Sequence, residues 1–268
     1  MKISFSTLGC PEWPWKEILV AAKDLGYDGI EIRGIEKEVY VPKLDPFLPE
    51  NIESTKKELK RTGLDISCLT SSCFLFDEDQ DRYLKEGKEY IDAAANLGVP
   101  YIRVLGDRDP QPDQNVNKAQ VAQMLLELGN YAKDRQVTVL IESNGVYADS
   151  KVMLDLMLEV NHPWIGVLWD IHHPYRYYNE PVEETYSRLK EYIRHVHIKD
   201  SIFLDGKNKY CLLGQGDIPV KQALNILKEA SYSNYISLEW VKRWYYDLEE
   251  PAIAFSHFIN IVKEILGG

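Results

Sequence analysis

Short hydrophobic runs alternate with longer amphipathic stretches from one end of the chain to the other. The runs are rich in Ile, Val, Leu and Tyr, which is typical of strands buried on both faces of a parallel sheet. The pattern predicts eight strands, at Ile3–Thr7, Gly29–Arg33, Asp65–Thr70, Tyr101–Leu105, Thr138–Ser143, Gly166–Asp170, His195–Lys199 and Tyr235–Trp240.

Between these strands, apolar residues recur at helical spacing, so that one face of each stretch is hydrophobic. The predicted helices are Trp15–Leu25, Glu50–Arg61, Asp81–Leu97, Lys118–Arg135, Lys151–Val160, Val182–Tyr192, Pro219–Ala230 and Leu248–Leu266. A glycine follows two of them, Gly26 and Gly98, as expected of the residue after a helix end. The segment that follows Leu25 is similar to the one that follows Leu97, which indicates a weakly repeated unit.

Eight strand–helix units with no linker between them predict the α/β class and a (β/α)8 TIM barrel. The length of 268 residues suits one such barrel, so we expect residues 1–268 to form a single TIM-barrel domain. An open, doubly wound sheet is the alternative. The first strand–helix turn, Thr7–Glu12, lacks the G-x-G-x-x-G pattern that often accompanies such a sheet.

Composition narrows the class of protein further. A hydrophobic content of 45% and a charged content of 27% describe an ordinary globular protein. The net charge of −11 does not favour a protein that must neutralise many phosphates of a nucleic acid. We find no signal-peptide pattern at the N-terminus and no apolar run of about 20 residues. Four cysteines without a C-x-x-C pair predict reduced thiols, so we expect a cytoplasmic protein that binds neither nucleic acid nor membrane.

Four acidic or imidazole side chains stand where predicted strands end. They are Glu142, Asp170, His197 and Glu239, on the fifth to eighth strands. In a barrel the C-terminal ends of the strands form the active site, so these groups are expected to converge. Carboxylate and imidazole donors without a competing thiol suit Mn, Mg, Co or Zn. The pattern predicts a metal or catalytic site.

Around these residues the chain resembles the xylose isomerase-like barrels, a superfamily that includes sugar-phosphate isomerases, ketose 3-epimerases, hydroxypyruvate isomerases, inosose dehydratases and endonuclease IV. The resemblance runs over nearly the whole chain. Its most specific parts are Ile141–Asn144, Trp169–His173, His195–Asp200 and Leu238–Trp240.

The resemblance implies that Glu142, Asp170, His197 and Glu239 bind one divalent metal ion. It also implies that a histidine near Asp170 reaches the substrate or a second metal. The spacing favours His173 for that role, and His172 is the alternative.

The resemblance further implies isomerisation or epimerisation of a sugar, through removal of a proton beside a carbonyl and a metal-stabilised enediolate. Glu142 and Glu239 would then be the catalytic acid/base pair as well as metal ligands. Alternatively, both glutamates are ligands only. Lys199 and Arg103 are candidate substrate contacts, and an ion pair with a neighbouring acid is the alternative for each.

Aromatic side chains near the strand ends are candidates for the walls of a sugar pocket. Tyr175 lies in the loop His173–Asn179, Trp240 begins the loop after the last strand, and Trp15 follows the first strand. The glycine-rich segment Gly214–Pro219 is either a helix start, with Asp217 as its cap, or a phosphate site.

We therefore expect a metal-dependent isomerase or epimerase that acts on a free or phosphorylated carbohydrate. An inosose dehydratase-like lyase is the nearest alternative. A DNA repair nuclease is disfavoured because the third and fourth strands end without the histidines of endonuclease IV-like chains. A non-catalytic sugar-binding barrel is a further alternative. The resembling proteins are commonly dimers or tetramers, so a homodimer or homotetramer is an open expectation.

Overall fold

The computed structural model describes residues 1–267, and its strands form a closed parallel barrel. The barrel strands are β1 (Lys2–Ser6), β2 (Gly29–Ile32), β3 (Asp65–Phe74), β4 (Tyr101–Leu105), β5 (Thr138–Glu142), β6 (Ile165–Asp170), β7 (Ile193–Ile198) and β10 (Tyr235–Leu238). Their order is β1-β10-β7-β6-β5-β4-β3-β2, which closes because β1 pairs with both β10 and β2. The predicted TIM barrel is confirmed, and the open doubly wound sheet is wrong.

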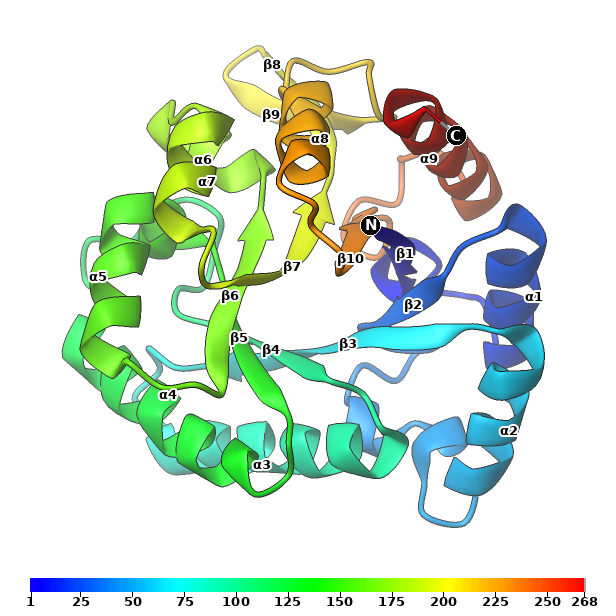
Figure 1. Ribbon diagram of the computed structural model, residues 1–268, viewed down its shortest axis with the longest axis horizontal. Helices are drawn as coiled ribbons and strands as arrows, with labels where there is room; N and C mark the ends of the chain where they lie inside the picture. Colours follow the sequence, from blue (N-terminus) through cyan, green and yellow to red (C-terminus); the bar gives the residue numbers. More distant parts are fainter. Residues whose placement is uncertain (268) are drawn as a thin grey trace. The chain divides into compact units, whose positions relative to one another are not determined.

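Helices follow the strands along the chain, as the colour gradient of Figure 1 shows. They are α1 (Trp15–Leu25), α2 (Ile52–Thr62), α3 (Gln80–Leu97), α4 (Lys118–Lys133), α5 (Ser150–Val160), α6 (His172–Tyr178), α7 (Val182–Leu189), α8 (Val220–Glu229) and α9 (Pro251–Leu266). Gly26 follows the end of α1 and Gly98 follows the end of α3, both with a φ of 76°, which confirms the predicted helix ends.

The chain forms two compact units, residues 1–67 with 196–268 and residues 68–195. In the first unit β1 lies between β10 and β2, and Ser237 of β10 pairs with His197 of β7. In the second unit β4, β5 and β6 pair in turn, with Glu142 opposite Leu168. The strand interiors are fully buried, as their continuous hydrophobic runs require. A single domain over the whole chain stays a prediction.

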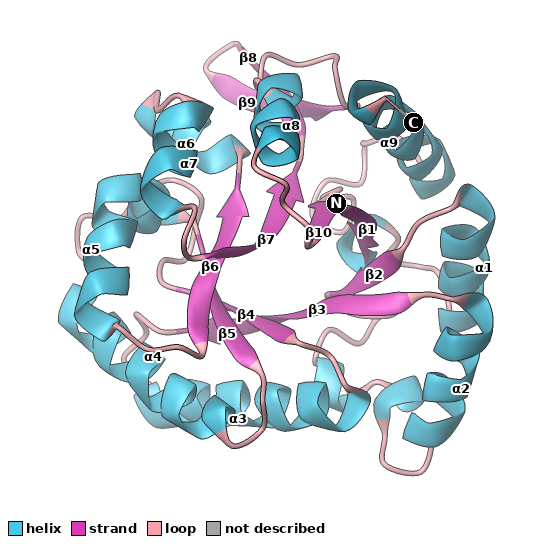
Figure 2. Ribbon diagram, in the orientation of Figure 1, coloured by secondary structure: helices cyan, strands magenta, loops and turns pink. Residues whose placement is uncertain are grey.

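A hairpin after β7 and a short helix after β6 were not expected from the sequence (Figure 2). An antiparallel hairpin of β8 (Asp200–Leu204) and β9 (Lys207–Cys211) follows β7 directly. The predicted loop His173–Asn179 is instead helical over most of its length, as α6, which ends where Asn179 adopts a φ of 51°. A short helix, α6, therefore lies between β6 and α7.

Cys10, Cys68 and Cys73 are buried, and Cys211 is half-buried. Among the described residues, no helix combines the length and the apolar character that a membrane crossing needs.

Candidate active site

In the second unit, two of the predicted acids end neighbouring strands and are almost fully buried. Glu142 is the last residue of β5 and Asp170 the last of β6. Arg103 on β4 lies beside them in the sheet order, with its Nε 3.1 Å from Glu142 Oε2. Its Nη1 donates a hydrogen bond to the Ser71 carbonyl at 2.9 Å, which fixes the guanidinium against β3. Arg103 therefore has the ion pair that was the alternative to a substrate contact.

Asp170 is held in place by its neighbours on both sides. The Ser143 hydroxyl accepts a hydrogen bond from the Asp170 backbone N–H at 2.8 Å. The carboxylate Oδ1 accepts the backbone N–H of His172 at 2.8 Å, and Oδ2 lies 3.6 Å from His173 Nε2. The second nitrogen of His173 lies 3.1 Å from the Ser143 carbonyl oxygen. The His173 imidazole therefore contacts both the Asp170 carboxylate and the Ser143 carbonyl, and the choice between His173 and His172 as the substrate contact stays a prediction.

A second buried aspartate, which the sequence did not single out, organises the loops after β4 and β5. Asp107 accepts backbone N–H groups from Arg108, Asp113 and Val146 at 2.7, 3.0 and 2.9 Å. At Gly145 a Cβ atom would lie 2.2 Å from Asp107 Oδ2, and φ is +56°, so only glycine fits. The Asn144 amide closes the arrangement by donating to the Asp107 carbonyl. These contacts with Asp107 explain why Asn144 and Gly145 follow shortly after Glu142.

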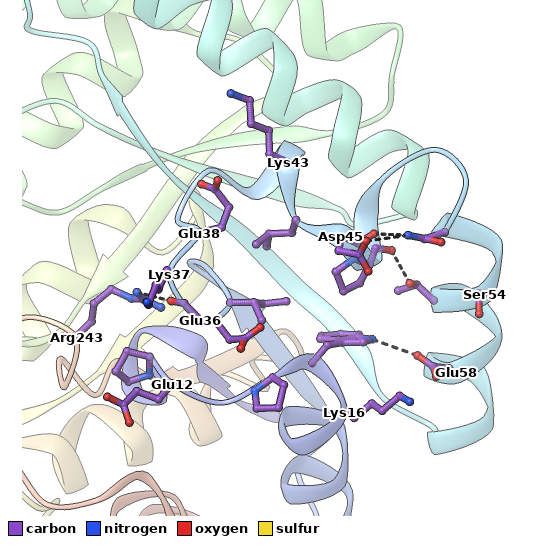
Figure 3. A pocket seen from close by; sticks show the side chains of 18 of the residues that line it. Glu12, Lys16, Glu36, Lys37, Glu38, Lys43, Asp45, Ser54, Glu58 and Arg243 are labelled. Atoms are coloured by element: carbon purple, nitrogen blue, oxygen red, sulfur yellow. Dashed lines mark hydrogen bonds between the residues drawn. The ribbon is translucent and has the colours of Figure 1, made fainter.

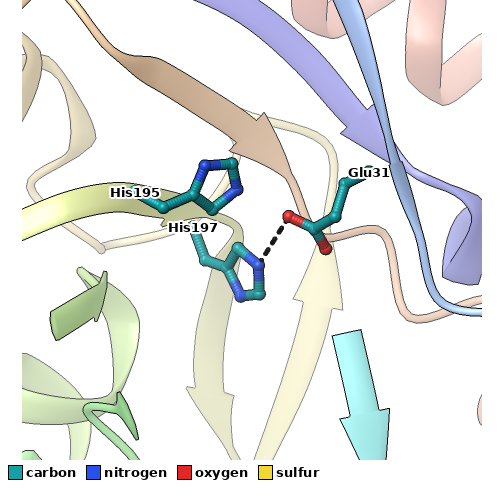
Figure 4. Close-up of side chains that lie close together, drawn as sticks. All are labelled: Glu31, His195 and His197. Atoms are coloured by element: carbon teal, nitrogen blue, oxygen red, sulfur yellow. Dashed lines mark hydrogen bonds and ion pairs between the residues drawn. The ribbon is translucent and has the colours of Figure 1, made fainter. Parts of the chain in front are cut away.

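In the first unit, His197 lies between two carboxylates. Its Nε2 is 2.9 Å from Oε2 of Glu31 on β2 (Figure 4). Its Nδ1 is 3.4 Å from Glu239 Oε1. The imidazole is completely buried, and His195 precedes it on the same strand. A histidine whose second nitrogen is held by a carboxylate has a fixed ring orientation and tautomer. The Glu31 carboxylate therefore holds the His197 ring in its orientation.

Glu239 has a cationic partner of its own. Lys199 Nζ donates a hydrogen bond to Glu239 Oε2, and both side chains are buried. Lys199 stands two residues after His197, so it points to the same side of the chain. Each of these glutamates thus forms an ion pair within its own unit, Glu142 with Arg103 and Glu239 with Lys199.

Asp200 holds the glycine-rich segment that was a candidate phosphate site. Its carboxylate accepts the backbone N–H groups of Gly214, Gly216 and Ile218 at 2.8, 3.0 and 3.2 Å. Burial raises the pKa of this carboxyl, and the backbone hydrogen bonds oppose the rise. Because the N–H groups already bind Asp200, this segment is structural. The helix begins later than expected, at Val220, with Pro219 rather than Asp217 as its cap residue.

The predicted pocket walls differ in their surroundings. Trp15 lines a cavity in the first unit, and its indole N–H donates to Glu58 Oε2 at 3.2 Å. Trp240 is 2% exposed and donates to the Glu249 carbonyl at 3.0 Å, so it also anchors the loop after β10. Tyr175 is half-buried on α6.

The strand ends therefore carry buried carboxylate oxygens and imidazole nitrogens. Among the described residues, groups of buried acids and imidazoles that could hold a metal ion include Asp170 with His172 and His173, and Glu31 with His195 and His197. None contains a cysteine. Such donor sets suit a divalent cation of the Mn, Mg, Co or Zn type.

Replacing Ser143 tests whether its hydroxyl holds Asp170 in position. In Ser143→Ala the buried Asp170 N–H loses its acceptor, so we expect the free energy of unfolding to fall by about 1–2 kcal/mol. Urea denaturation measures the change, with the exposed Ser187→Ala on α7 as the control. Equal stability of the two variants would contradict a positioning role for Ser143.

The chain belongs to the xylose isomerase-like TIM barrel family, whose model matches residues 19–258. It is 26% identical over 268 residues to the fructoselysine 3-epimerase of Shigella flexneri, covering 94% of each chain. It is 24% identical over 259 residues to the L-ribulose-5-phosphate 3-epimerase UlaE of Escherichia coli O157:H7, covering 93% of this chain and 89% of the relative. The crystal structure of the IolI protein with a bound zinc atom has the same fold, with a TM-score of 0.80 at 19% identity, covering 100% of this chain and 98% of that one.

Proposed function

We propose that the protein is a metal-dependent sugar epimerase that inverts a ketose at the carbon beside its carbonyl. The relatives named above are both 3-epimerases of ketose derivatives, which supports an enzyme of this class acting on a carbohydrate. The observation that carries the proposal is the pair of buried glutamates at the ends of β5 and β10, each with a cationic partner. Inversion of a carbon requires one group to remove a proton and another to return it.

The proposed ligands of one divalent ion are Glu142, Asp170, His197 and Glu239. They lie on β5, β6 and β7 or directly after β10, which follow one another in the closed barrel. All four are buried, and each offers one carboxylate oxygen or imidazole nitrogen. A bound divalent ion supplies Lewis-acid stabilisation of negative charge that develops on the substrate oxygens. Mn, Mg, Co and Zn are all consistent with these donors, and a zinc-containing relative of the same fold supports the assignment.

Within this site the protein's own residues have distinct proposed roles. Glu142 and Glu239 act as the acid/base pair, one for each face of the substrate carbon. Glu31 keeps the His197 ring oriented through the 2.9 Å contact to Nε2, which leaves Nδ1 on the side of Glu239. Arg103 and Lys199 balance the charge of the two glutamates through their ion pairs, and in this proposal they also bind substrate oxygens. His173 remains the proposed substrate contact beside Asp170.

A substrate panel in deuterium oxide tests the proposal. We expect a ketose, a ketose phosphate or a ketose conjugate to yield its C3 epimer with deuterium at that carbon, seen by NMR, only when Mn, Mg, Co or Zn is added. Loss of water with a new carbonyl would instead identify a lyase. Turnover that is equally fast after complete metal removal would overturn the metal-dependent proposal.

A further inference from the structure

A large cavity in the first unit contains a buried cation that none of the proposed roles uses. The cavity has a volume of about 1200 Å³ and lies between α1, the segment after β2, and the loop after β10. Arg243 lines it, although this side chain is only 8% exposed (Figure 3). Glu239, a proposed ligand and acid/base group, stands four residues earlier in the same loop.

One side of the Arg243 guanidinium is bonded and the other is not. Nη1 donates to the Glu36 carbonyl at 2.9 Å, and the backbone N–H of Arg243 donates to the Leu8 carbonyl at 3.1 Å. Nε and Nη2 are buried and have no hydrogen-bond partner. Burial lowers the pKa of this guanidinium, and the neighbours that act on its charge are Cys10 and Tyr246, neither of which is a carboxylate. Burying donors of a charged group without partners costs free energy.

The two Arg243 atoms without a hydrogen-bond partner indicate which ligand groups could bind to them. Nε and Nη2 form one edge of the guanidinium, and their two parallel N–H groups match two oxygens of a carboxylate or a phosphate. The turn Ile35–Glu38, which covers this region, is held by two backbone hydrogen bonds between Ile35 and Glu38, and its three last side chains are exposed. The Glu36 carbonyl of this turn accepts the Arg243 Nη1 N–H, and both the turn and Arg243 line the cavity.

We propose that Arg243 binds an oxyanion at the remote end of the substrate, through its Nε–Nη2 edge in this cavity. The substrate class is then a sugar that carries a phosphate or a carboxylate, and the assignment to substrate rests on the proposed function. The glycine-rich segment before α8 is not an alternative, because Asp200 occupies its N–H groups. Arg243 thus gives the protein a selective subsite, separate from the acid/base pair.

Calorimetric titration tests the subsite without turnover, using the full-length protein at fixed ionic strength. We expect inorganic phosphate or acetate to bind the wild type, and Arg243→Gln to weaken that binding at least about tenfold. Arg243→Lys keeps the charge but lacks the paired N–H groups, so it should bind with intermediate affinity. Arg61→Gln removes an exposed arginine of α2 and serves as the control for net charge.

The choice of probe separates the two sources of oxyanion. Tighter binding of phosphate points to a sugar phosphate, and tighter binding of acetate points to a sugar conjugated to an acid. No binding of either probe to the wild type, or equal binding to wild type and Arg243→Gln, would overturn the proposal. Neither result would affect metal-dependent epimerisation, so the two proposals fail separately.

Discussion

Replacing Glu142 or Glu239 by glutamine is expected to slow solvent deuterium incorporation at the reacting carbon by about a thousandfold. An amide of nearly the same shape neither removes nor returns the proton, and general acid–base catalysis contributes about 10²–10⁴-fold to rate. Each glutamate also faces a cation, Arg103 or Lys199, which the neutral amide would leave without its counter-charge. The measurement is the exchange rate by NMR for each variant at saturating metal.

Because both residues are also proposed ligands, the metal content of each variant is measured on the same samples. A variant that keeps its metal and loses exchange assigns the proton-transfer role directly. Glu127→Gln, at an exposed position of α4, controls for the substitution itself and should exchange at the wild-type rate. Wild-type exchange in both Glu142→Gln and Glu239→Gln would rule out the two-glutamate mechanism and leave both residues as ligands only.

Metal binding is the second large effect that we expect. Protein re-metallated with Mn, Co or Zn should hold about one tightly bound ion per chain, and His197→Ala should lose it. The ligand set must be deprotonated to bind a cation, so affinity should decrease as pH falls. A bound ion stabilises the folded state by mass action, so chelation should lower the Tm of the wild type more than that of His197→Ala.

Elemental mass spectrometry gives the stoichiometry. His257→Ala is the matched control, because this imidazole lies on α9 and its Nε2 contacts the Leu213 carbonyl at 2.8 Å. Three zinc ions per chain would instead favour the nuclease alternative. An absence of binding for every metal tested would remove the proposed role of the four strand-end residues.

The regular elements were predictable because each depends on a local pattern. A buried parallel strand must be apolar throughout, and an outer helix needs one apolar face. Both patterns can be recognised in a short stretch of sequence. Helix α1 matches its predicted bounds, and the glycines after α1 and α3 adopt the left-handed conformation that ended those helices. The closed order of strands followed from the number of repeated units and is confirmed.

The segments after β6 and β7 were less predictable. α6 contains Pro174 and several tyrosines, and such a stretch is as compatible with a loop as with a short helix. The apolar run of β8 is only three residues long, Ile202–Leu204, and Phe203 and Leu204 are exposed, while β9 is mostly polar. The hairpin therefore lacks the longer buried run that revealed the barrel strands. Its strands form by pairing with each other, which a pattern of single residues does not encode.

The sequence by itself determined the barrel and the donor types at the strand ends, since the position of Glu142, Asp170, His197 or Glu239 relative to its strand is a local property. Tertiary structure alone decided which groups meet. Glu31 contacts His197 across 166 positions of sequence. The Asp200 carboxylate binds backbone N–H groups of the glycine-rich segment, and Arg243 is a buried cation with two nitrogen donors that have no hydrogen-bond partner. Hydrogen bonds and burial of this kind depend on how distant strands close into a barrel, and no short stretch of chain carries that information.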